Sequence, residues 1–277
     1  MRKPFVAPWV ALALLAAPPL EAQITVPDTP PPATRVGGSI VATPPEGPLP
    51  RQANGRPDLT GLWLRRAGTG NISQLLPEGE RMPLLPETLA RMRALKAADD
   101  PQLHCLPIPT PRGNPYPFRM VETPTHLFIL NESMHGYRQV FMDGRPHPAA
   151  DELQPSWHGH SIGWWEGDTL VVDTVGFNDL TWFDNYGHLH SDRLHVVERF
   201  TRRNLGTLDV AMTIDDPGAY SRVFTLDYSA LLMPTGELME YMCEENNQDT
   251  PYIEGPAAPG LEWEKERATG LPPSSSR

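Results

Sequence analysis

The stretch RLHVVERFTRRNLGTLDVAMTIDD, residues 193–216, contains two segments in which apolar and polar side chains alternate. When apolar and polar residues alternate with a period of two, every second side chain lies on the same face of an extended strand. Asn204 and Gly206 lie between the two segments, and both residue types favour tight reversals of the chain. The stretch therefore predicts two antiparallel strands joined by a short turn.

The same alternation recurs through the middle of the chain. It predicts six further strands, over residues 58–65, 126–133, 137–144, 168–177, 222–231 and 238–245. Only the segment that starts at Pro86 has a helical period, with Leu89, Met92 and Leu95 on one face. Strands linked mainly by short turns indicate an antiparallel barrel or sandwich, and a closed barrel leaves no unpaired edge strand. We therefore predict a mainly β protein, an antiparallel, lipocalin-like barrel with one helix near its N-terminal side and extended termini.

Composition divides the chain into four parts. Residues 1–22 combine a basic start, a short apolar run and a cleavage-like site, which predicts a signal peptide rather than a membrane span. Residues 23–56 are rich in Pro, Gly and Thr and are predicted to be a disordered tether. Residues 57–249 hold the strong alternation and are predicted to form one β-barrel domain, followed by a polar tail over residues 250–277.

Charge and cysteine content restrict the partners and the compartment. The formal net charge of −11, with no basic stripe in the sequence, disfavours nucleic acid as a partner. After removal of the signal peptide we expect no membrane span, so the protein is predicted to be periplasmic or secreted. In such a chain Cys105 and Cys243 predict one disulfide, with two separately buried thiols as the alternative.

Two motifs resemble known families. Gly61-Leu62-Trp63 resembles the Gly-x-Trp of the first strand of lipocalin-like barrels, in which the tryptophan plugs the closed end. The run WEGDTLVVDT, residues 165–174, together with GHLHSDRLHVVERFTR, TIDDPGAY and EYMCEEN, resembles a family of exported bacterial proteins over about residues 57–247. That resemblance implies export and a β-rich fold, but no particular reaction. The family usually has a basic residue before Trp165, so Trp164 is expected to alter the cavity wall.

Two pairs of histidines, His158 with His160 and His188 with His190, have one residue between their members. On extended backbone the imidazoles of each pair share a face, so two facing pairs could supply three or four ligands to a metal ion such as zinc. The alternatives are imidazoles bonded to backbone carbonyls, and imidazoles that exchange protons with a ligand or contact it. No motif in the sequence requires a cofactor. The one cofactor that these four histidines allow is a divalent metal such as zinc.

Several acidic residues stand among apolar ones on predicted strands. Glu198 shares a face with the apolar residues of the strand over 193–202, and a carboxylate on an inward face must be paired or hold a raised pKa. Glu132 and Glu240 are predicted to lie in the same way. With Arg138 as a partner, these glutamates form either a buried ion-pair network or the polar floor of a ligand cavity.

Four tryptophans surround the histidines in the sequence: Trp157, Trp164, Trp165 and Trp182. Four indoles near one mouth of a barrel form either ordinary core or a platform for a sugar or a flat apolar ligand. Within residues 156–174, the part before residue 168 is expected to be a loop that leads into the next strand.

The sequence contains no motif of serine hydrolases of the G-x-S-x-G type, H-E-x-x-H metalloproteases, P-loop enzymes or dinucleotide-binding enzymes. We therefore expect an exported small-molecule enzyme, a lyase, isomerase or hydrolase that needs no cofactor, or else a non-catalytic lipocalin-like carrier or sensor. The substrate is expected to be partly apolar or carbohydrate-derived and to bind in the barrel.

The residues predicted to carry this chemistry fall into two groups. The predicted catalytic residues are His160 and His190, which exchange protons, Asp173 and Asp184, either of which orients a histidine such as His160 or His190, and Glu198. Substrate contacts are assigned to Glu132, Arg138, Trp157, Trp164, Trp165 and Trp182. The sequence does not indicate which substrate is bound or how the chain assembles.

Overall fold

The structure is a computed structural model in which residues 33–36, 39–65, 70–112, 116–245, 247–248 and 252–257 are described. The predicted signal peptide, part of the predicted tether and most of the predicted tail lie outside these residues. In the described part of the chain, no helix is long and apolar enough to cross a membrane.

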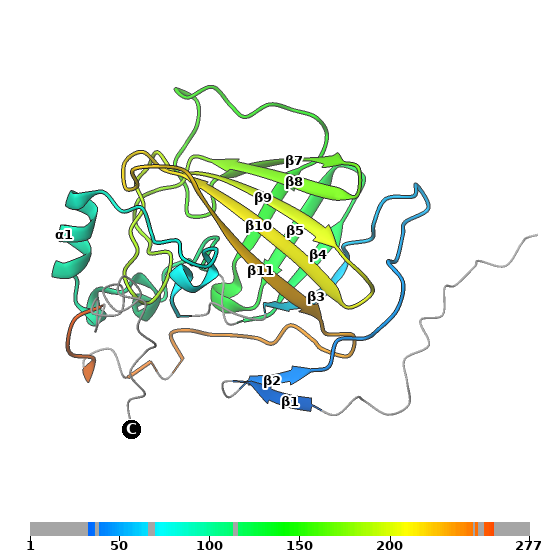
Figure 1. Cartoon of the computed structure of the whole chain (residues 1–277), viewed down its shortest axis with the longest axis horizontal. Helices are drawn as coiled ribbons and strands as arrows, with labels where there is room; N and C mark the ends of the chain where they lie inside the picture. Colours follow the sequence, from blue (N-terminus) through cyan, green and yellow to red (C-terminus); the bar gives the residue numbers. More distant parts are fainter. Residues whose placement is uncertain are drawn as a thin grey trace, which may run out of the picture.

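Nine strands form a closed barrel (Figure 1). In chain order they are β3 (Gly61–Arg65), β4 (Phe118–Glu122), β5 (His126–Asn131), β6 (Tyr137–Phe141), β7 (His160–Glu166), β8 (Thr169–Val175), β9 (His195–Arg202), β10 (Thr207–Asp215) and β11 (Phe224–Leu232). Around the barrel the order is β10-β11-β3-β4-β5-β6-β7-β8-β9. Neighbouring strands are antiparallel except β6 and β7, which are parallel. The predicted mainly β barrel is confirmed, and this parallel pair is its one departure from an antiparallel arrangement.

The other elements are not part of the barrel wall. β1 (Ala33–Val36) and β2 (Ser39–Ala42) pair with each other, and α1 (Pro86–Ala94) is the one α-helix of the described residues. Four 3-10 helices are η1 (Ile72–Leu75), η2 (Ala97–Asp99), η3 (Pro101–His104) and η4 (Ser133–His135). α1 begins at Pro86, as predicted, because a proline in the first turn loses no helical hydrogen bond.

Parts of the predicted tether and tail contact the folded domain. Arg51 forms a bidentate ion pair with Asp168, with N to O distances of 2.8 and 2.6 Å. The carbonyl of Gly47 accepts the N–H of Leu205 at 3.1 Å. Near the other end of the chain, Ala257 is buried beside α1. Composition does not predict these contacts, because each depends on a partner far away in the sequence.

The strand predictions fail in three places. β4 is not predicted because it is short and follows a proline-rich stretch. β7 is expected to be a loop, but it pairs with β8 over its whole length, and Gly167, with φ +61°, makes the tight turn between them. The strand predicted over residues 238–245 is wrong, since the described chain there forms no strand. That segment is held instead by Cys243 and by Met239, whose N–H donates to the Glu132 carboxylate at 2.9 Å.

The parallel contact between β6 and β7 is short. It pairs only Val140 with Ser161 and Phe141 with Ile162. Parallel strands need a long crossover connection, and residues 142–159 provide it on the outside of the barrel, as the long loop beside β7 in Figure 1. The barrel wall is therefore least continuous at this seam.

Two apolar clusters fill the barrel. The first includes Val196 and lies under η1, and the second includes Phe200 and Trp63. Tyr228 packs against both clusters. Because Glu198 lies between Val196 and Phe200 on the inward face of β9, it is located in a polar layer between the two clusters.

The three glutamates predicted to face inward have different outcomes. Glu198 is 2 % exposed and faces inward, as predicted. The prediction for Glu132 is wrong, since the buried residues of β5 are Leu127 and Ile129, on the opposite face from the one expected. A shift of one residue in the register of a strand exchanges its inward and outward faces, so alternation alone does not decide which face is buried. Glu240 is exposed in the segment that forms no strand, so that prediction is also wrong.

Trp63 is part of the second apolar cluster. Its side chain is fully buried, and its Nε1 donates to the carbonyl of Leu59 at 3.0 Å. The guanidinium of Arg202 lies over the indole, 4.9 Å from the ring centre, and donates to the carbonyls of Asn204 and Leu205.

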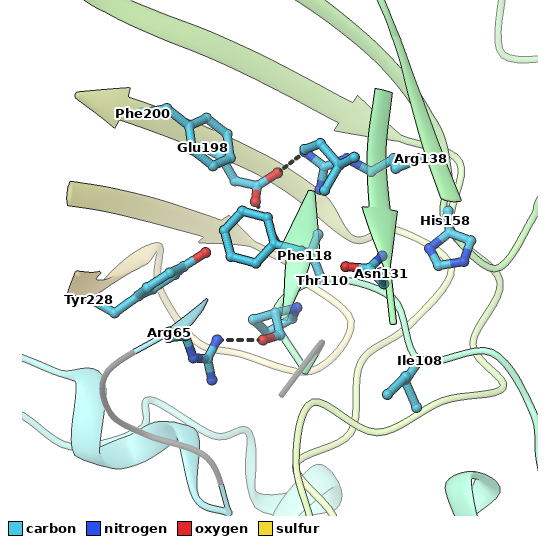
Figure 2. Close-up of a pocket in the computed structure, with 12 residues that line it drawn as sticks. Arg65, Ile108, Thr110, Phe118, Asn131, Arg138, His158, Glu198, Phe200 and Tyr228 are labelled. Atoms are coloured by element: carbon cyan, nitrogen blue, oxygen red, sulfur yellow. Dashed lines mark hydrogen bonds and ion pairs between the residues drawn. The ribbon is translucent and has the colours of Figure 1, made fainter. Parts of the chain in front are cut away.

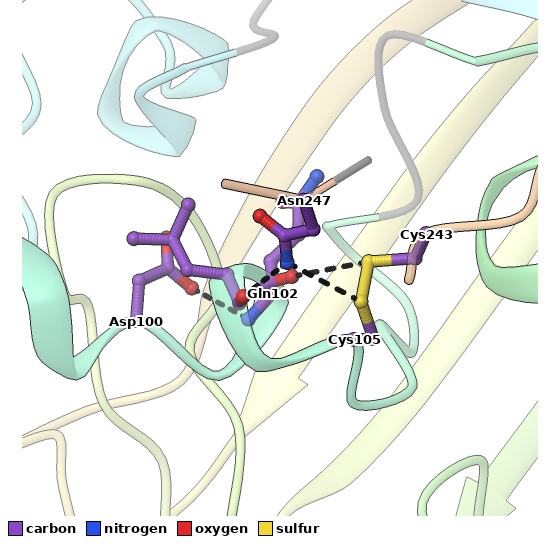
Figure 3. The surroundings of a disulfide bond; sticks show 6 residues. Asp100, Gln102, Cys105, Cys243 and Asn247 are labelled. Carbon is purple, nitrogen blue, oxygen red and sulfur yellow. Dashed lines mark hydrogen bonds between the residues drawn. A yellow bond between two sulfur atoms is a disulfide. The ribbon is translucent and has the colours of Figure 1, made fainter. Parts of the chain in front are cut away.

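Cys105 and Cys243 form the predicted disulfide, with their Cα atoms 5.5 Å apart (Figure 3). The bond fastens the segment after β11 to the loop that follows η3. Further along this loop, Arg112 makes a buried bidentate ion pair with Asp100, at 2.7 and 2.5 Å. The loop over residues 105–112 is therefore held at both ends.

Replacing both cysteines (Cys105→Ser with Cys243→Ser) is expected to lower the free energy of unfolding by about 2–4 kcal/mol. The bond joins residues separated by 138 positions, so its removal greatly enlarges the conformational freedom of the unfolded chain. Urea denaturation of the variant and of wild type in non-reducing buffer measures the difference. Reduced wild type serves as the control and should lose the same amount; equal stability of all three samples would contradict the prediction.

Candidate functional site

A groove of about 630 Å³ lies on the outside of the barrel, at the seam between β6 and β7. Its walls are β6, the start of β7 and the connection over residues 142–159. The apolar part of its lining includes Tyr137, Phe141, Leu153 and Trp157, and the polar part includes Arg138, His158 and His160.

Four residues form a hydrogen-bonded chain that ends in this groove. Nδ1 of His160 is 2.8 Å from Nδ1 of His147. Nε2 of His147 is 3.0 Å from Oδ1 of Asp173, and Nε2 of His195 is 2.9 Å from the same oxygen. His160, Asp173 and His195 come from the outward faces of β7, β8 and β9, and His147 comes from the connection over residues 142–159. These four residues are termed the histidine relay.

The hydrogen-bonding rules of each group fix where the protons of the relay lie. An ionised Asp173 only accepts hydrogen bonds, so His147 donates its Nε2–H to it. In neutral His147 the Nδ1 is then unprotonated and accepts the Nδ1–H of His160. Neutral His160 therefore carries its proton on Nδ1, and its Nε2 has an available lone pair. The groove is thus lined by an oriented imidazole with one basic nitrogen.

Burial and neighbouring charges set the protonation of the relay. Burial lowers the pKa of His160, and the positive charge of Arg145 lowers it further. Burial opposes ionisation of Asp173, but the hydrogen bonds from His195 and His147 outweigh it and lower the pKa of the carboxyl. The hydrogen bond to Asp173 raises the pKa of His195. At neutral pH His160 is unprotonated and Asp173 is ionised, which is the state that a general base requires.

His158 lies between the groove and a smaller cavity inside the barrel, since it lines both. Burial and the positive charge of Arg138 lower the pKa of its imidazole to about 4, so the ring is neutral at neutral pH. No group in the described residues makes a hydrogen bond to this ring. Gly136 leaves room for it, because a Cβ at that position would lie 3.3 Å from the ring atoms Cε1 and Nε2.

The smaller cavity, of about 50 Å³, contains the polar layer of the barrel (Figure 2). Glu198 and Arg138 form a buried ion pair on its wall, and the Thr110 hydroxyl donates to the second carboxylate oxygen at 3.2 Å. The guanidinium carbon of Arg65 lies 4.7 Å from the ring centre of Tyr228. Burial raises the pKa of Tyr228 to about 12, so its hydroxyl keeps its proton at neutral pH.

The structure brings together only some of the residues assigned to proton exchange. His160 and Asp173 are joined through His147, whereas Glu198 lies inside the barrel. His190 and Asp184 lie in neither space and are buried elsewhere.

His190 and Asp184 have partners that fix the chain between β8 and β9. Asp184 accepts hydrogen bonds from the backbone N–H of Ile72 at 2.8 Å and from Nδ1 of His188 at 2.6 Å. Nε2 of His190 is 2.8 Å from the hydroxyl oxygen of Thr181. These contacts satisfy buried polar groups and hold a loop, so we assign them a structural role.

The two histidine pairs do not face each other. His188 and His190 are buried in the structural cluster just described, whereas His158 and His160 line the groove. Among the described residues, no group of three or more His, Cys, Asp or Glu side chains is arranged to hold a metal ion. The geometry therefore does not bring together the four histidines considered as zinc ligands.

Of the residues assigned to substrate contacts, Arg138 and Trp157 line the groove. Trp182 is buried in the core beside α1, and Trp165 packs against the second apolar cluster. Trp164 is 40 % exposed on the outer surface of the barrel, so the expectation that it alters a cavity wall is wrong.

Sequence reasoning missed His147 and His195. His147 stands between two prolines in a connection that has no periodicity, so no local pattern marks it. His195 and Asp173 both lie on outward faces of neighbouring strands, and the strand register of the barrel is needed to bring them together. His195 could have been found by a search for His and Asp residues on the outward faces of strands that are predicted to be neighbours.

In comparisons with known proteins, no protein-family model matches the chain, and neither a curated protein nor a solved structure matches it. The chemistry of the groove and of the interior cavity is therefore the basis for assigning a function.

Proposed function

We propose that the chain is a small-molecule enzyme in which His160 acts as a general base in the groove. The observation that supports this proposal most directly is the chain of hydrogen bonds from Asp173 through His147 to His160. A positioned general base contributes about 10²–10⁴-fold to a rate. The reaction begins when Nε2 of His160 removes a proton from the substrate or from a water molecule, as in a lyase, an isomerase or a hydrolase.

The groove has the size and lining of a small-molecule site. Its volume of about 630 Å³ lies within the range of about 300–1,000 Å³ that is typical of such sites. Tyr137, Phe141 and Trp157 supply flat apolar surface, which suits a partly apolar or carbohydrate-derived substrate. Arg138 and His158 supply polar contacts close to the interior.

The alternative function, a carrier or sensor that holds its ligand inside the barrel, has weaker support. Such a protein needs an interior of several hundred Å³ for its ligand. Here two apolar clusters occupy the barrel and leave a cavity of about 50 Å³ between them. This volume favours the groove as the place where the body of a ligand binds.

We also propose that the protein is exported, as a member of the bacterial family that its residues 165–174 resemble. The disulfide supports an oxidising compartment, because such bonds are rare in reducing ones. The composition of residues 1–22 supports a signal peptide.

The test uses p-nitrophenyl acetate as a substrate probe and diethyl pyrocarbonate, which acylates unprotonated imidazole nitrogens, as a label. We expect the protein to hydrolyse the ester faster than an equal concentration of free imidazole does. The first equivalent of label should modify His160 and stop hydrolysis, with the exposed His104 as the internal control. Modification of His104 before His160, or hydrolysis that continues after His160 is labelled, would overturn the proposal.

Hydrolysis is expected to lose rate in acid with a midpoint below pH 6.5. The pKa of His160 is lowered from 6.5, so the basic form survives to a lower pH than in a free histidine, and protonation then removes the lone pair. The pH dependence of kcat/KM measures this midpoint. A midpoint above 6.5 would show that the relay does not hold His160 in its neutral form.

A further inference from the structure

Arg138 has an unused hydrogen-bond donor at the place where the groove and the interior cavity adjoin. Its side chain lines both spaces and is 6 % exposed. One of its terminal nitrogens is paired with Glu198, which balances the charge of the guanidinium (Figure 2). In the described part of the chain, Nε of Arg138 is buried and has no hydrogen-bond acceptor. Because a buried donor without an acceptor is costly, this position favours a ligand that supplies a neutral acceptor atom.

His158 is a second polar group at the same junction. Its ring lines both spaces, and no hydrogen bond to it forms within the residues that the structure describes. Burial and the charge of Arg138 keep this imidazole neutral at neutral pH, and a neutral imidazole has one N–H donor. Two donors at one junction suit a carbonyl oxygen, since its two lone pairs can accept two hydrogen bonds.

The interior cavity suits a short acyl chain. Its volume of about 50 Å³ has room for a few non-hydrogen atoms. Ile108, Phe118 and Phe200 supply apolar lining, against which a methyl group can pack. The groove, with about 630 Å³, has room for a much larger body. The two spaces therefore fit a ligand with a short apolar end, a carbonyl group at the junction and a larger part outside.

We propose that the site takes small acyl esters, with a short acyl chain in the cavity and the alcohol part in the groove. The carbonyl oxygen then accepts hydrogen bonds from Nε of Arg138 and from the ring of His158. The ester as substrate rests on the proposed function of His160, whereas binding of a carbonyl compound at the junction does not.

The reaction of such a substrate is hydrolysis of the ester. Nε2 of His160 takes a proton from a water molecule, and the water oxygen forms a bond to the carbonyl carbon. The electron pair of the C=O π bond moves to the carbonyl oxygen, where Arg138 and His158 donate to the charge that develops. When this pair returns, the bond to the alcohol oxygen breaks and that oxygen takes the proton from His160. The products are a carboxylic acid and an alcohol.

The first experiment measures binding without hydrolysis. 4-Nitrophenylacetone is p-nitrophenyl acetate with a CH₂ group in place of the ester oxygen, so it keeps the carbonyl but cannot be hydrolysed. 1-Nitro-4-propylbenzene has a further CH₂ group in place of the carbonyl and is the matched control ligand. Calorimetric titration of the full-length protein should show tighter binding of the ketone, although the hydrocarbon chain loses less hydration on binding. Equal or tighter binding of 1-nitro-4-propylbenzene would overturn the proposal.

Paired variants assign this preference to Arg138. Arg138→Met with Glu198→Met removes the donor without leaving one charge unpaired. It should lower the ratio of the two affinities by about tenfold or more, as the loss of a hydrogen bond to a charged group does. Arg199→Met with Glu166→Met removes an ion pair at 2.6 Å from the outer surface and should leave the ratio unchanged. The same ratio in both double variants would contradict the proposal.

The length of the acyl chain tests the cavity without those variants. We expect kcat/KM to fall by about tenfold or more from p-nitrophenyl acetate to p-nitrophenyl octanoate, because the longer chain exceeds the cavity. Each rate is first divided by the rate of the same ester with free imidazole. If the acyl chain lay in the groove, burial of its apolar surface would make the octanoate the better substrate. That result would overturn the proposal.

Enlarging the cavity should change this preference. Phe118→Leu removes part of the cavity wall and should raise kcat/KM for p-nitrophenyl butanoate relative to the acetate by about tenfold. Phe183→Leu makes the same change in the first apolar cluster, away from both spaces, and should keep the wild-type ratio. An equal ratio in the two variants would show that the cavity does not receive the acyl chain.

His160→Ala separates this inference from the proposed function. The residue is not part of the cavity lining, so the variant should still prefer 4-nitrophenylacetone while it loses hydrolysis of p-nitrophenyl acetate. A preference for the ketone without any hydrolysis in wild type would refute the proposed function, and with it the ester as substrate, but not the carbonyl site. Hydrolysis that depends on His160, without that preference, would refute only the carbonyl site.

Discussion

His160→Ala is expected to lower kcat/KM for p-nitrophenyl acetate by about 10²–10⁴-fold, the usual contribution of a positioned general base. The imidazole is partly exposed on the outer face of β7, so its removal leaves the two apolar clusters of the barrel intact. The measurement is the initial rate of release of p-nitrophenol, with circular dichroism as a check of the fold. His104→Ala, which removes an exposed imidazole outside the groove, is the matched control and should keep the wild-type rate.

Asp173→Asn tests whether the relay positions His160. Asparagine keeps the shape of aspartate but removes the charge that requires His147 to donate from Nε2, so the protons of both imidazoles are no longer fixed. We expect a loss of rate smaller than that of His160→Ala, because the base itself is still present. The ¹⁵N signals of His160 give a readout that a structural role would not change. They should report an unprotonated Nε2 in wild type and a mixture of tautomers in Asp173→Asn.

These two variants also give results that would exclude the relay. A wild-type rate in His160→Ala would mean that another group, with His158 as the nearest candidate, performs the hydrolysis. A His160 ring protonated on Nε2 in wild type would mean that the hydrogen bond between the two Nδ1 atoms runs in the opposite direction. In that case the lone pair would not be available to the groove.

The barrel could be predicted because most of its strands have one buried and one solvated face. Residues 193–216 show this well, since the inward residues of β10 are all apolar, those of β9 include Val196 and Phe200, and a turn separates the strands. β7 escaped prediction because two of its inward positions are Ser161 and Gly163, which carry no apolar signal. The parallel pairing of β6 with β7 was also hidden, because alternation gives the faces of a strand but not the direction of its neighbour.

The candidate site was predictable only where a polar residue stood out against its surroundings. Glu198 was noticed because a carboxylate among inward apolar residues needs an explanation. The histidine relay lies on outward faces, where polar side chains are the normal case and attract no attention. Asp173 was identified as a residue that orients His160, but the link between them is His147, which enters from a connection without a pattern. Tertiary structure, and no local property of the sequence, brings these groups together.

Arg138→Met is expected to lower the free energy of unfolding by about 3–5 kcal/mol, the loss that follows when one partner of a buried ion pair is removed. The reason lies in the partner that stays behind, since Glu198 is 2 % exposed and keeps only the hydroxyl of Thr110 as a hydrogen-bond donor to its carboxylate in the described residues. Urea denaturation measures the loss. Arg199→Met, which breaks an ion pair between side chains that are 42 % and 46 % exposed, is the control and should change stability by less than about 1 kcal/mol.

The double variant Arg138→Met with Glu198→Met separates the effect of the unpaired charge from that of lost packing. If the unpaired carboxylate causes the loss, removing it as well should restore most of the stability, because apolar side chains can replace a buried ion pair with little change. If the double variant is as unstable as Arg138→Met, the methylene groups of Arg138 stabilise the barrel by packing. The charges of the pair would then contribute little to the free energy of unfolding.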